Sequence, residues 1–319
     1  MNITLRSEVP SDYYAIAELH AVTFSYGFDL SEVVIVDGQR HLPNFDHELS
    51  LVAEDNGKVV GHVLFQPYEV RIDSQPIQAV CLAPISVHPE YQKKGIGGRL
   101  IEEGCNRARD KGYEMSFLLG HSSYYPRFGY QPRMFGTCTI QIKRSELKEN
   151  QAHIEERRVQ AADIPLLASW WSDWYEKTDL SIFPGTSVLN WISHGKGTRS
   201  SLVMIDGEEA GYLSYEVHKP YHIQCFLAKN RESAGNILSY LNETLEGYKE
   251  DEISIALHPE ADATKRLIPY SYHSTIDVWD AGMIKILDPQ NEQIHRYCRE
   301  VKLGERPPGL IVWPTLFQL

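Results

Sequence analysis

The chain has 319 residues and carries 31 basic against 43 acidic side chains, so its formal net charge is −12. Apolar residues make up 42% and charged residues 23%, which excludes a disordered or collagen-like chain. The acidic balance argues against nucleic acid as a partner. No run approaches the roughly 18 apolar residues of a membrane span, and the first residues lack the apolar core of a signal peptide, so no membrane association is expected.

Five cysteines are scattered along the chain, odd in number and never spaced C-x-x-C. This usage is typical of a reducing compartment and argues against a disulfide framework or a structural zinc site. We therefore expect a cytoplasmic protein without a metal. The length predicts about two domains of ~150 residues each.

Two stretches about 150 residues apart have the same order of predicted elements. The first begins with the strand ITLR, the acidic cap Asp12 and a helix; the second begins with HIEERRVQ, Asp163 and another helix. In each copy an SLV run then leads through a polar glycine turn into a second apolar run, which predicts a hairpin. CTIQIKR at 138–144 is echoed by MIKILD at 283–288. The sequence thus predicts a tandem repeat.

The repeat predicts one domain at 1–148, a second at 149–288 and a C-terminal tail at 289–319. Prolines in the tail oppose a long helix, and its apolar residues predict that it packs back on the body. After the hairpin, the first copy has a glycine-rich basic turn that the second copy lacks. Only the first copy is therefore expected to carry chemistry.

A short strand, a glycine turn and a helix are predicted between residues 82 and 112. The turn reads QKKGIGGR and follows the strand APISV, and the helix behind it has its apolar residues on one face. Glycines let a ligand approach the backbone, while the free N–H groups and the dipole of a helix start attract anions. The turn therefore predicts a pyrophosphate site. Its spacing is neither that of a P-loop nor that of the dinucleotide fingerprint.

The turn does match Q/R-x-x-G-x-G/A directly after a strand, and in this it resembles the GNAT superfamily of N-acetyltransferases. A second motif, YPRFGY at 125–130, follows the buried strand predicted within 112–120 and is similar to the Y-x-R-F-G-F/Y sequence of many GNAT enzymes. The resemblance covers residues 3 to about 145. With a degenerate second half, the arrangement is similar to that of Eis-like acetyltransferases, although the chain is too short for their large sterol-carrier-like C-terminal domain.

The resemblance implies an α/β (α+β) GNAT fold, with a mixed central β-sheet flanked by helices and a second, degenerate GNAT-like domain. It implies acetyl-CoA as the co-substrate, with its pyrophosphate on the turn, its pantetheine arm along the preceding strand and its carbonyl oxygen near the amide of Val87. The cofactor-binding residues implied are Ile85, Ser86, Val87, Gln92, Lys93, Lys94, Gly95, Ile96, Gly97, Gly98 and Arg99.

Tyr125 matches the tyrosine that protonates the leaving thiolate in the family, so the resemblance implies it as the general acid; a core tyrosine is the alternative. Tyr124 is the adjacent candidate, and Tyr130 is expected to pack. Some Eis-like enzymes use their C-terminal carboxylate as the base, which here is that of Leu319. The base stays open among this carboxylate and His47, Glu54 and His88.

The expected activity is transfer of an acetyl group from coenzyme A to a primary amine of a small molecule or protein. A non-catalytic acyl-CoA-binding sensor or scaffold is the alternative. The resemblance implies that the segment between the first strand and the hairpin, about 24–46, lines the pocket for the acceptor amine. Its aromatic and acidic residues suit a cationic amine, but an ordinary solvated loop would explain the same residues. Trp170, Trp171 and Trp174 are expected in the core. The family includes homo-oligomers, but the residues of this chain do not indicate its oligomeric state.

Overall fold

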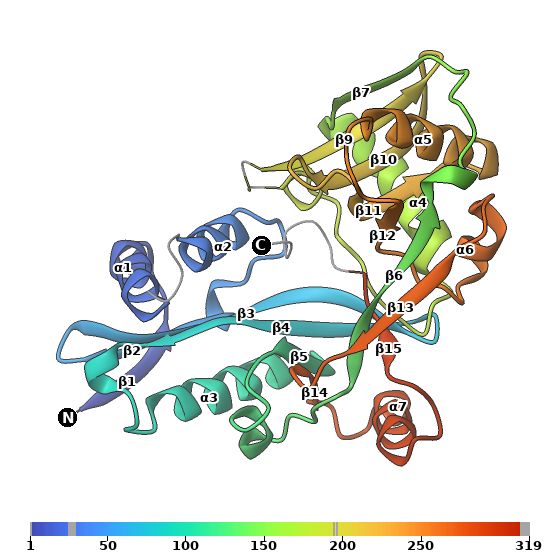
Figure 1. The fold of residues 1–319 in the computed structure, drawn as a ribbon. Coiled ribbons are helices and arrows are strands. Elements are labelled where there is room, and N and C mark those ends of the chain that lie inside the picture. The colour runs from blue at the N-terminus through green and yellow to red at the C-terminus, as the bar shows by residue number, and fades with distance from the viewer. Residues whose placement is uncertain (1, 25–29, 194, 196, 313–319) are drawn as a thin grey trace. The chain divides into compact units, whose positions relative to one another are not determined.

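The computed structural model describes residues 2–24, 30–193, 195 and 197–312 (Figure 1). The chain forms two compact units, neither of which is contiguous. Unit 1 comprises Met1–Glu69, Pro76–Met134 and Trp279–Pro308, and unit 2 comprises Val70–Gln75, Phe135–Val278 and Gly309–Leu319. Among the described residues, no helix is both long and apolar enough to cross a lipid bilayer.

A mixed β-sheet forms the centre of unit 1. Its strands in spatial order are β1 (Ile3–Ser7), β2 (Ser50–Asp55), β3 (Lys58–Ile72), β4 (Gln75–Val87), β5 (Met115–Leu119) and β14 (Gly282–Ile286). The pairs β1–β2, β2–β3 and β5–β14 are antiparallel, whereas β4 and β5 run parallel. The last strand therefore comes from the second sequence copy.

Helices cover both faces of this sheet (Figure 1). One face carries α1 (Tyr13–Thr23) and α2 (Ser31–Arg40), and the other carries α3 (Ile96–Asp110). The apolar residues of α3 recur on one side of the helix and pack against the sheet, as the sequence predicts. The remaining helix of unit 1 is α7 (Glu292–Leu303), which belongs to the predicted tail.

Unit 2 has a sheet of its own. Its strands in spatial order are β13 (His273–Val278), β6 (Phe135–Lys143), β12 (Glu252–Ile255), β11 (His222–Ala228), β10 (Glu208–Glu216), β9 (Thr198–Ile205) and β7 (Ile154–Arg158). β15 (Gly309–Leu310) pairs with β6, and β8 (Leu180–Ile182) pairs with the end of β3, Val70–Ile72. The helices are α4 (Ile164–Tyr175), α5 (Arg231–Thr244) and α6 (Asp262–Leu267). Trp170, Trp171 and Trp174 lie in its hydrophobic core, which confirms that expectation.

The stretches that begin with β1 and with β7 open with the same local structure. The Arg6 guanidinium donates to both carboxylate oxygens of Asp12, at 2.6 and 2.9 Å, and Arg157 donates to both oxygens of Asp163, at 2.8 Å each. Each carboxylate also accepts the backbone N–H three residues earlier and so fixes the entry to α1 or α4. A strand, an acidic cap, a helix and a hairpin thus occur in the same order in both.

The compact units cross the predicted divisions at 148 and 288, because the copies exchange a strand. β6 of the first copy lies between β12 and β13 in unit 2, and β14 of the second copy lies beside β5 in unit 1. The tail is also divided, since α7 belongs to unit 1 and β15 to unit 2. The boundaries 1–148, 149–288 and 289–319 stay a prediction about sequence copies and a tail, whereas the packing follows the exchanged strands.

Candidate functional site

The glycine turn lies between β4 and α3 in unit 1. A 3-10 turn, Pro89–Tyr91, follows β4 directly, and α3 begins at Ile96. Gly95 is the residue before the helix and has φ 80°, a left-handed conformation that favours glycine. The Gln92 side chain donates to the Val87 carbonyl at 3.0 Å and so ties the turn to the end of the strand.

Six successive backbone N–H groups, from Lys93 to Gly98, have no hydrogen-bond acceptor recorded in the described part of the chain. The first bonded amide is that of Arg99, which donates to the Gly95 carbonyl at 3.1 Å. Unpaired amides at the start of a 15-residue helix, with the positive end of its dipole behind them, are an arrangement that attracts anions. This is the geometry that the predicted pyrophosphate site requires.

Two side chains of the YPRFGY region cover the start of α3. A Cβ on Gly97 would lie 2.8 Å from the Tyr124 hydroxyl, and a Cβ on Gly98 would lie 2.9 Å from the Phe128 ring. A side chain at either position would therefore have to displace Tyr124 or Phe128. The glycine turn and the YPRFGY region are separate in the sequence, but they are in contact in the structure.

The cations near the turn divide into two groups. Lys93 and Lys94 are exposed on the turn itself, and the Lys94 ammonium donates to the Glu90 carbonyl at 2.8 Å. Arg99, predicted to face the phosphates, instead donates to the Ile3 carbonyl at 3.1 Å. Only the two lysines therefore stand directly on the turn.

The strand β4 changes register just before the turn. Val80 and Leu82 pack in the same cluster as Ile85 and Val87, so the alternation of faces slips by one residue between Leu82 and Ile85. β5 pairs with β4 only over Ala79–Cys81, and no further pair between the two strands is recorded for the described residues. The edge of β4 from 82 to 87 is thus open toward β5 and available to another extended chain.

Tyr125 is packed in the core of unit 1. Its ring would lie 2.2 Å from a Cβ on Gly120, and it contacts the rings of Tyr124 and Tyr130 edge-on. Burial raises the pKa of Tyr125 to about 12, so its hydroxyl is protonated at neutral pH. Within the described residues no hydrogen bond is recorded for this hydroxyl. Tyr130 is fully packed, and its hydroxyl contacts Ser116 Oγ at 2.7 Å.

The candidate bases named from the sequence lie in different settings. Glu54 accepts two hydrogen bonds from the Arg6 guanidinium, at 2.8 and 3.0 Å. His47 is exposed, and the His88 imidazole caps the 3-10 turn by accepting the Glu90 N–H at 3.4 Å. Leu319, like all of 313–319, lies outside the described residues, as do Tyr26, Phe28 and Asp29 of the acceptor segment.

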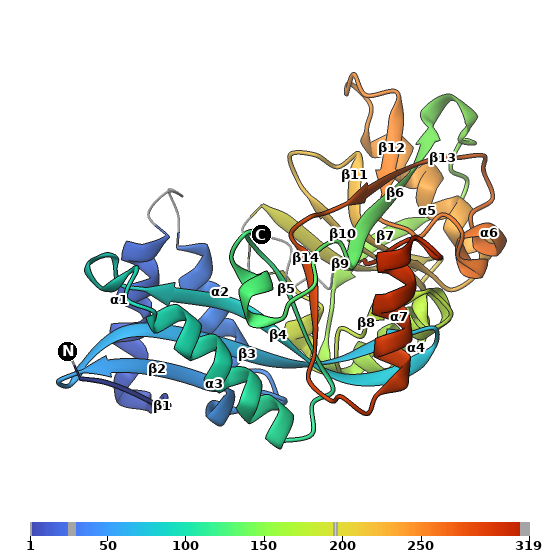
Figure 2. The same cartoon turned by 90° about the horizontal axis from the view of Figure 1, so that it is seen from below.

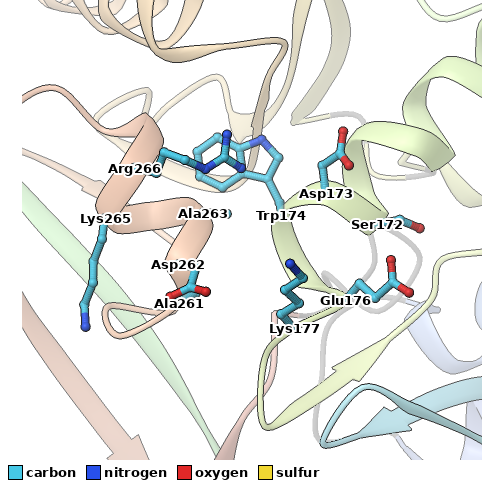
Figure 3. A pocket seen from close by; sticks show the side chains of 10 residues that line it. All are labelled: Ser172, Asp173, Trp174, Glu176, Lys177, Ala261, Asp262, Ala263, Lys265 and Arg266. Atoms are coloured by element: carbon cyan, nitrogen blue, oxygen red, sulfur yellow. The ribbon is translucent and has the colours of Figure 1, made fainter.

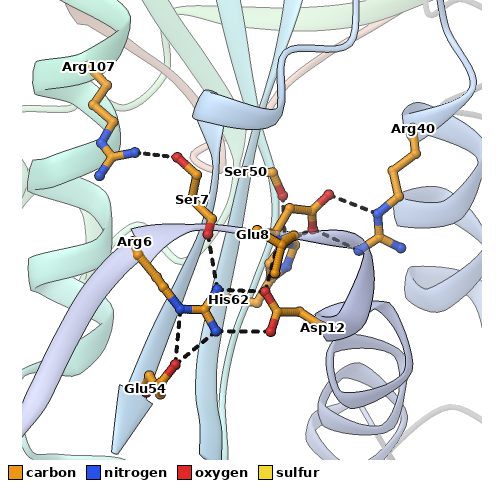
Figure 4. A network of polar contacts seen from close by, with 10 residues as sticks. Arg6, Ser7, Glu8, Asp12, Arg40, Ser50, Glu54, His62 and Arg107 are labelled. Atoms are coloured by element: carbon orange, nitrogen blue, oxygen red, sulfur yellow. Dashed lines mark hydrogen bonds and ion pairs between the residues drawn. The ribbon is translucent and has the colours of Figure 1, made fainter. Parts of the chain in front are cut away.

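The sequence analysis did not identify a group of buried polar side chains in unit 1, on the face of the sheet that α1 and α2 cover (Figure 1). Glu8, His20 and His62 have at most 2% of their surface exposed. Arg40 donates to both carboxylate oxygens of Glu8 (Figure 4). Ser86 Oγ of β4 lies 3.5 Å from His20 Nε2. The members come from different elements, so no local motif marks them; a charged residue inside a strand-to-helix connection, Glu8, is the one available signal.

A cavity of about 530 Å³ lies in unit 2 between α4 and α6 (Figure 3). Its lining includes both acidic and basic side chains, among them Asp173, Lys177, Asp262 and Lys265. Across the described residues, no group of three or more His, Cys, Asp or Glu side chains is placed to hold a metal ion.

The sequence of the first copy matches a family model. Residues 6–133 match the model of the acetyltransferase (GNAT) domain. These residues are a GNAT acetyltransferase domain. Over 86 residues the chain is also 48% identical to the uncharacterized N-acetyltransferase YjhQ of Escherichia coli K12, a match that covers 26% of this chain and 46% of YjhQ. The chain spans about half the length of the curated relatives it matches.

Solved structures show that the GNAT fold extends over most of the chain. A GCN5-related N-acetyltransferase from Kribbella flavida has a TM-score of 0.69 at 14% identity and covers 90% of this chain and 71% of its own. Eis1 from Mycobacterium abscessus has a TM-score of 0.61 at 13% identity, over 90% of this chain and 74% of its own. At such identities the likeness shows the fold alone. It confirms the predicted α/β fold and its likeness to Eis proteins.

Proposed function

We propose that the chain is an acetyl-CoA-dependent N-acetyltransferase that moves an acetyl group from coenzyme A to a primary amine of a small molecule or protein. The observation that carries this proposal is the row of unpaired amides from Lys93 to Gly98 at the end of a strand whose edge is open. The GNAT domain in residues 6–133 supports it. Scattered, free and buried cysteines support a reducing, cytosolic setting.

The turn fits the diphosphate of coenzyme A. Amides without acceptors supply donors, Gly95 allows close approach, and Lys93 and Lys94 add positive charge. The open edge of β4, including Ile85, Ser86 and Val87, fits the amide groups of a pantetheine arm, which would lie along it as a further strand does. The remaining residues of the implied set, Gln92, Ile96, Gly97, Gly98 and Arg99, shape the turn and the helix start.

The chemistry supplied by the bound thioester is an activated acetyl carbonyl. A backbone N–H near Val87 would stabilise charge on the carbonyl oxygen, an effect worth about 3 kcal/mol for one preorganised donor. The Tyr125 hydroxyl would protonate the departing thiolate, because it holds its proton at neutral pH and has no recorded partner among the described residues. The C-terminal carboxylate of Leu319 stays a candidate base.

The experiment is titration calorimetry with coenzyme A followed by a thiol-release assay on a panel of amines. Binding together with amine-dependent thiol release is expected. Binding without release would favour the alternative, a non-catalytic acyl-CoA sensor or scaffold. Failure to bind coenzyme A at all would contradict both.

A further inference from the structure

A chain of buried polar side chains runs through unit 1 from α2 to β4. Figure 4 shows its first part, from Arg40 through Glu8 to His62. Arg40 Nε and NH2 donate to the two oxygens of Glu8, at 3.0 and 2.8 Å. Glu8 Oε2 lies 3.5 Å from His62 Nε2, and His62 Nδ1 lies 2.8 Å from His20 Nε2. The two imidazoles have no exposed surface. The order of contacts is therefore guanidinium, carboxylate, imidazole, imidazole.

One assignment of the protons satisfies all of these contacts. With Glu8 ionised beside Arg40, the Nε2 of a neutral His62 carries the proton, which faces Glu8 and Ser50 Oγ. The Nδ1 of His62 is then an acceptor, so the 2.8 Å contact requires His20 Nε2 to donate. A neutral imidazole has one donor and one acceptor nitrogen, and His20 Nδ1 is thus a lone pair. This nitrogen is buried and has no hydrogen-bond partner.

The electrostatics agree with these protonation states. Burial lowers the pKa of His20 well below its ordinary value, and the charges of His62 and Arg40 lower it further, whereas Glu8 raises it. Burial also lowers the pKa of His62 against the opposing pull of Glu8. Burial raises the pKa of Glu8, but hydrogen bonds from His62 and Arg40 outweigh it and hold it at about 2.

Unit 2 shows that the fold does not need this network. Glu8 and His20 follow Arg6 by two and fourteen residues, and the same steps from Arg157 lead to Val159 and Trp171. Strand register gives the third counterpart. Arg6 is opposite Val52, which is opposite His62; Arg157 is opposite Leu202, which is opposite Tyr212.

The three counterparts, Val159, Trp171 and Tyr212, are buried in the hydrophobic core of unit 2. Trp171 and Tyr212 both pack edge-on against Trp191. Apolar packing therefore fills the same positions in the copy that lacks the glycine turn. Burying charged and polar groups costs free energy that apolar packing does not, so their retention in the first copy points to a use.

The network ends at the strand proposed for the thioester. Ser86 lies between Ile85 and Val87, and the register slip in β4 turns its side chain toward His20, whose Nε2 is 3.5 Å from Ser86 Oγ. His20 also lines a cavity of about 360 Å³ between α1 and α2, together with apolar residues, Asp37 and Arg40. The unpaired hydroxyl of Thr23 lies one turn further along α1.

We propose that His20 Nδ1 accepts the proton of the incoming ammonium, directly or through one water, and that His62 and Glu8 position it and carry the proton away. This rests on the proposed acetyltransferase function. The amine N–H bond breaks and a proton binds His20 Nδ1; the Nε2 proton of His20 passes to His62 Nδ1. His20 is then neutral again, and the imidazolium of His62 stands beside the carboxylate of Glu8. The freed lone pair of the amine attacks the thioester carbonyl and the C–S bond breaks. The leaving thiolate takes a proton from Tyr125, which the second proton of the amine nitrogen replaces.

The test compares His20→Gln with the wild type on two amines. Glutamine keeps an N–H donor toward His62 but has no basic nitrogen. For an alkylamine, of which only about one molecule in 10³ is neutral at pH 7, kcat/KM should fall about 10²–10⁴-fold. For an arylamine, already neutral at pH 7, the fall should be within about tenfold. His153→Gln, an exposed histidine of unit 2, is the matched control and should retain both rates.

A structural role would lower both rates equally. Equal losses on the two amines, or an unchanged alkylamine rate, would overturn the proposal while leaving the acetyltransferase function intact. Absence of thiol release by the wild type with every amine would instead overturn the proposed function and this inference with it. If His20→Gln does not fold, Glu8→Gln gives the same comparison, and the alkylamine rate should again fall more than the arylamine rate.

A pH profile adds a second readout. Lowering the pH protonates His20, so the wild-type kcat/KM for the alkylamine should fall on the acid side, with a pKa below the ordinary histidine value. The charged and titratable groups around His20 and His62 are Glu8, Asp12 and Arg40. In His20→Gln this acid limb should vanish; a limb that persists unchanged would contradict the assignment.

Discussion

The hydroxyl of Tyr124 lies 2.8 Å from the point that a Cβ on Gly97 would occupy. This contact joins the two motifs, because Tyr124 directly precedes YPRFGY and Gly97 is the second residue of α3. The turn is therefore shaped from outside by an aromatic side chain as well as by its own glycines.

Gly97→Ala should weaken coenzyme A binding at least about tenfold, because the added methyl group forces Tyr124 or the first helical turn to move. Titration calorimetry measures this. Gly38→Ala is the control, since a Cβ there meets no atom within 4 Å. The double variant Gly97→Ala with Tyr124→Phe should recover part of the affinity. No recovery would mean that the contact with this hydroxyl does not cause the loss.

Tyr125→Phe should lower kcat at least about tenfold while coenzyme A affinity stays unchanged, because only the proton donor is removed. Steady-state kinetics and calorimetry on the same sample check this. Tyr130→Phe is the comparison, since its hydroxyl bonds Ser116 in the core. Wild-type turnover in Tyr125→Phe would dismiss this phenol as the acid.

Acid should destabilise unit 1 in two steps. Burial lowers the pKa values of His20 and His62, so the unfolded chain binds more protons and stability falls as the pH drops below about 6.5. The pKa of Glu8, lowered to about 2, adds stability present above about 4.5 that is lost as the pH falls toward 2, at most about 3 kcal/mol.

Urea unfolding between pH 8 and 3 measures this dependence. His20→Gln should flatten the first step, and Glu8→Gln should flatten the second. A wild-type profile that does not change between pH 7 and 5 would show that the imidazoles are not held neutral.

Deleting residues 315–319 separates the two candidate proton acceptors. If His20 accepts the proton, kcat for an alkylamine should stay within about threefold of the wild type, since the network of Glu8, His62 and His20 lies wholly in unit 1. A loss of 100-fold or more, again on the order expected for a general base, with coenzyme A affinity retained, would assign the role to the Leu319 carboxylate.

How much the sequence predicts depends on how local the signal is. The glycine turn is contiguous, and Gly95 with φ 80° and the amides behind it follow from residues next to each other. The network of Glu8, His20 and His62 could not be predicted, because its members lie on separate elements and each alone is an ordinary polar residue in the sequence. The exchange of β6 and β14 could not be predicted for the same reason. Their sequence similarity indicates that they correspond, but pairing with strands more than 100 residues away decides which sheet each joins.

The most direct test of the central claim is a crystal structure of the protein with acetyl-CoA bound. The account predicts the diphosphate within hydrogen-bonding distance of the backbone N–H groups between Lys93 and Gly98, and the pantetheine arm along β4. A turn free of phosphate, with the molecule bound elsewhere or not at all, would contradict it.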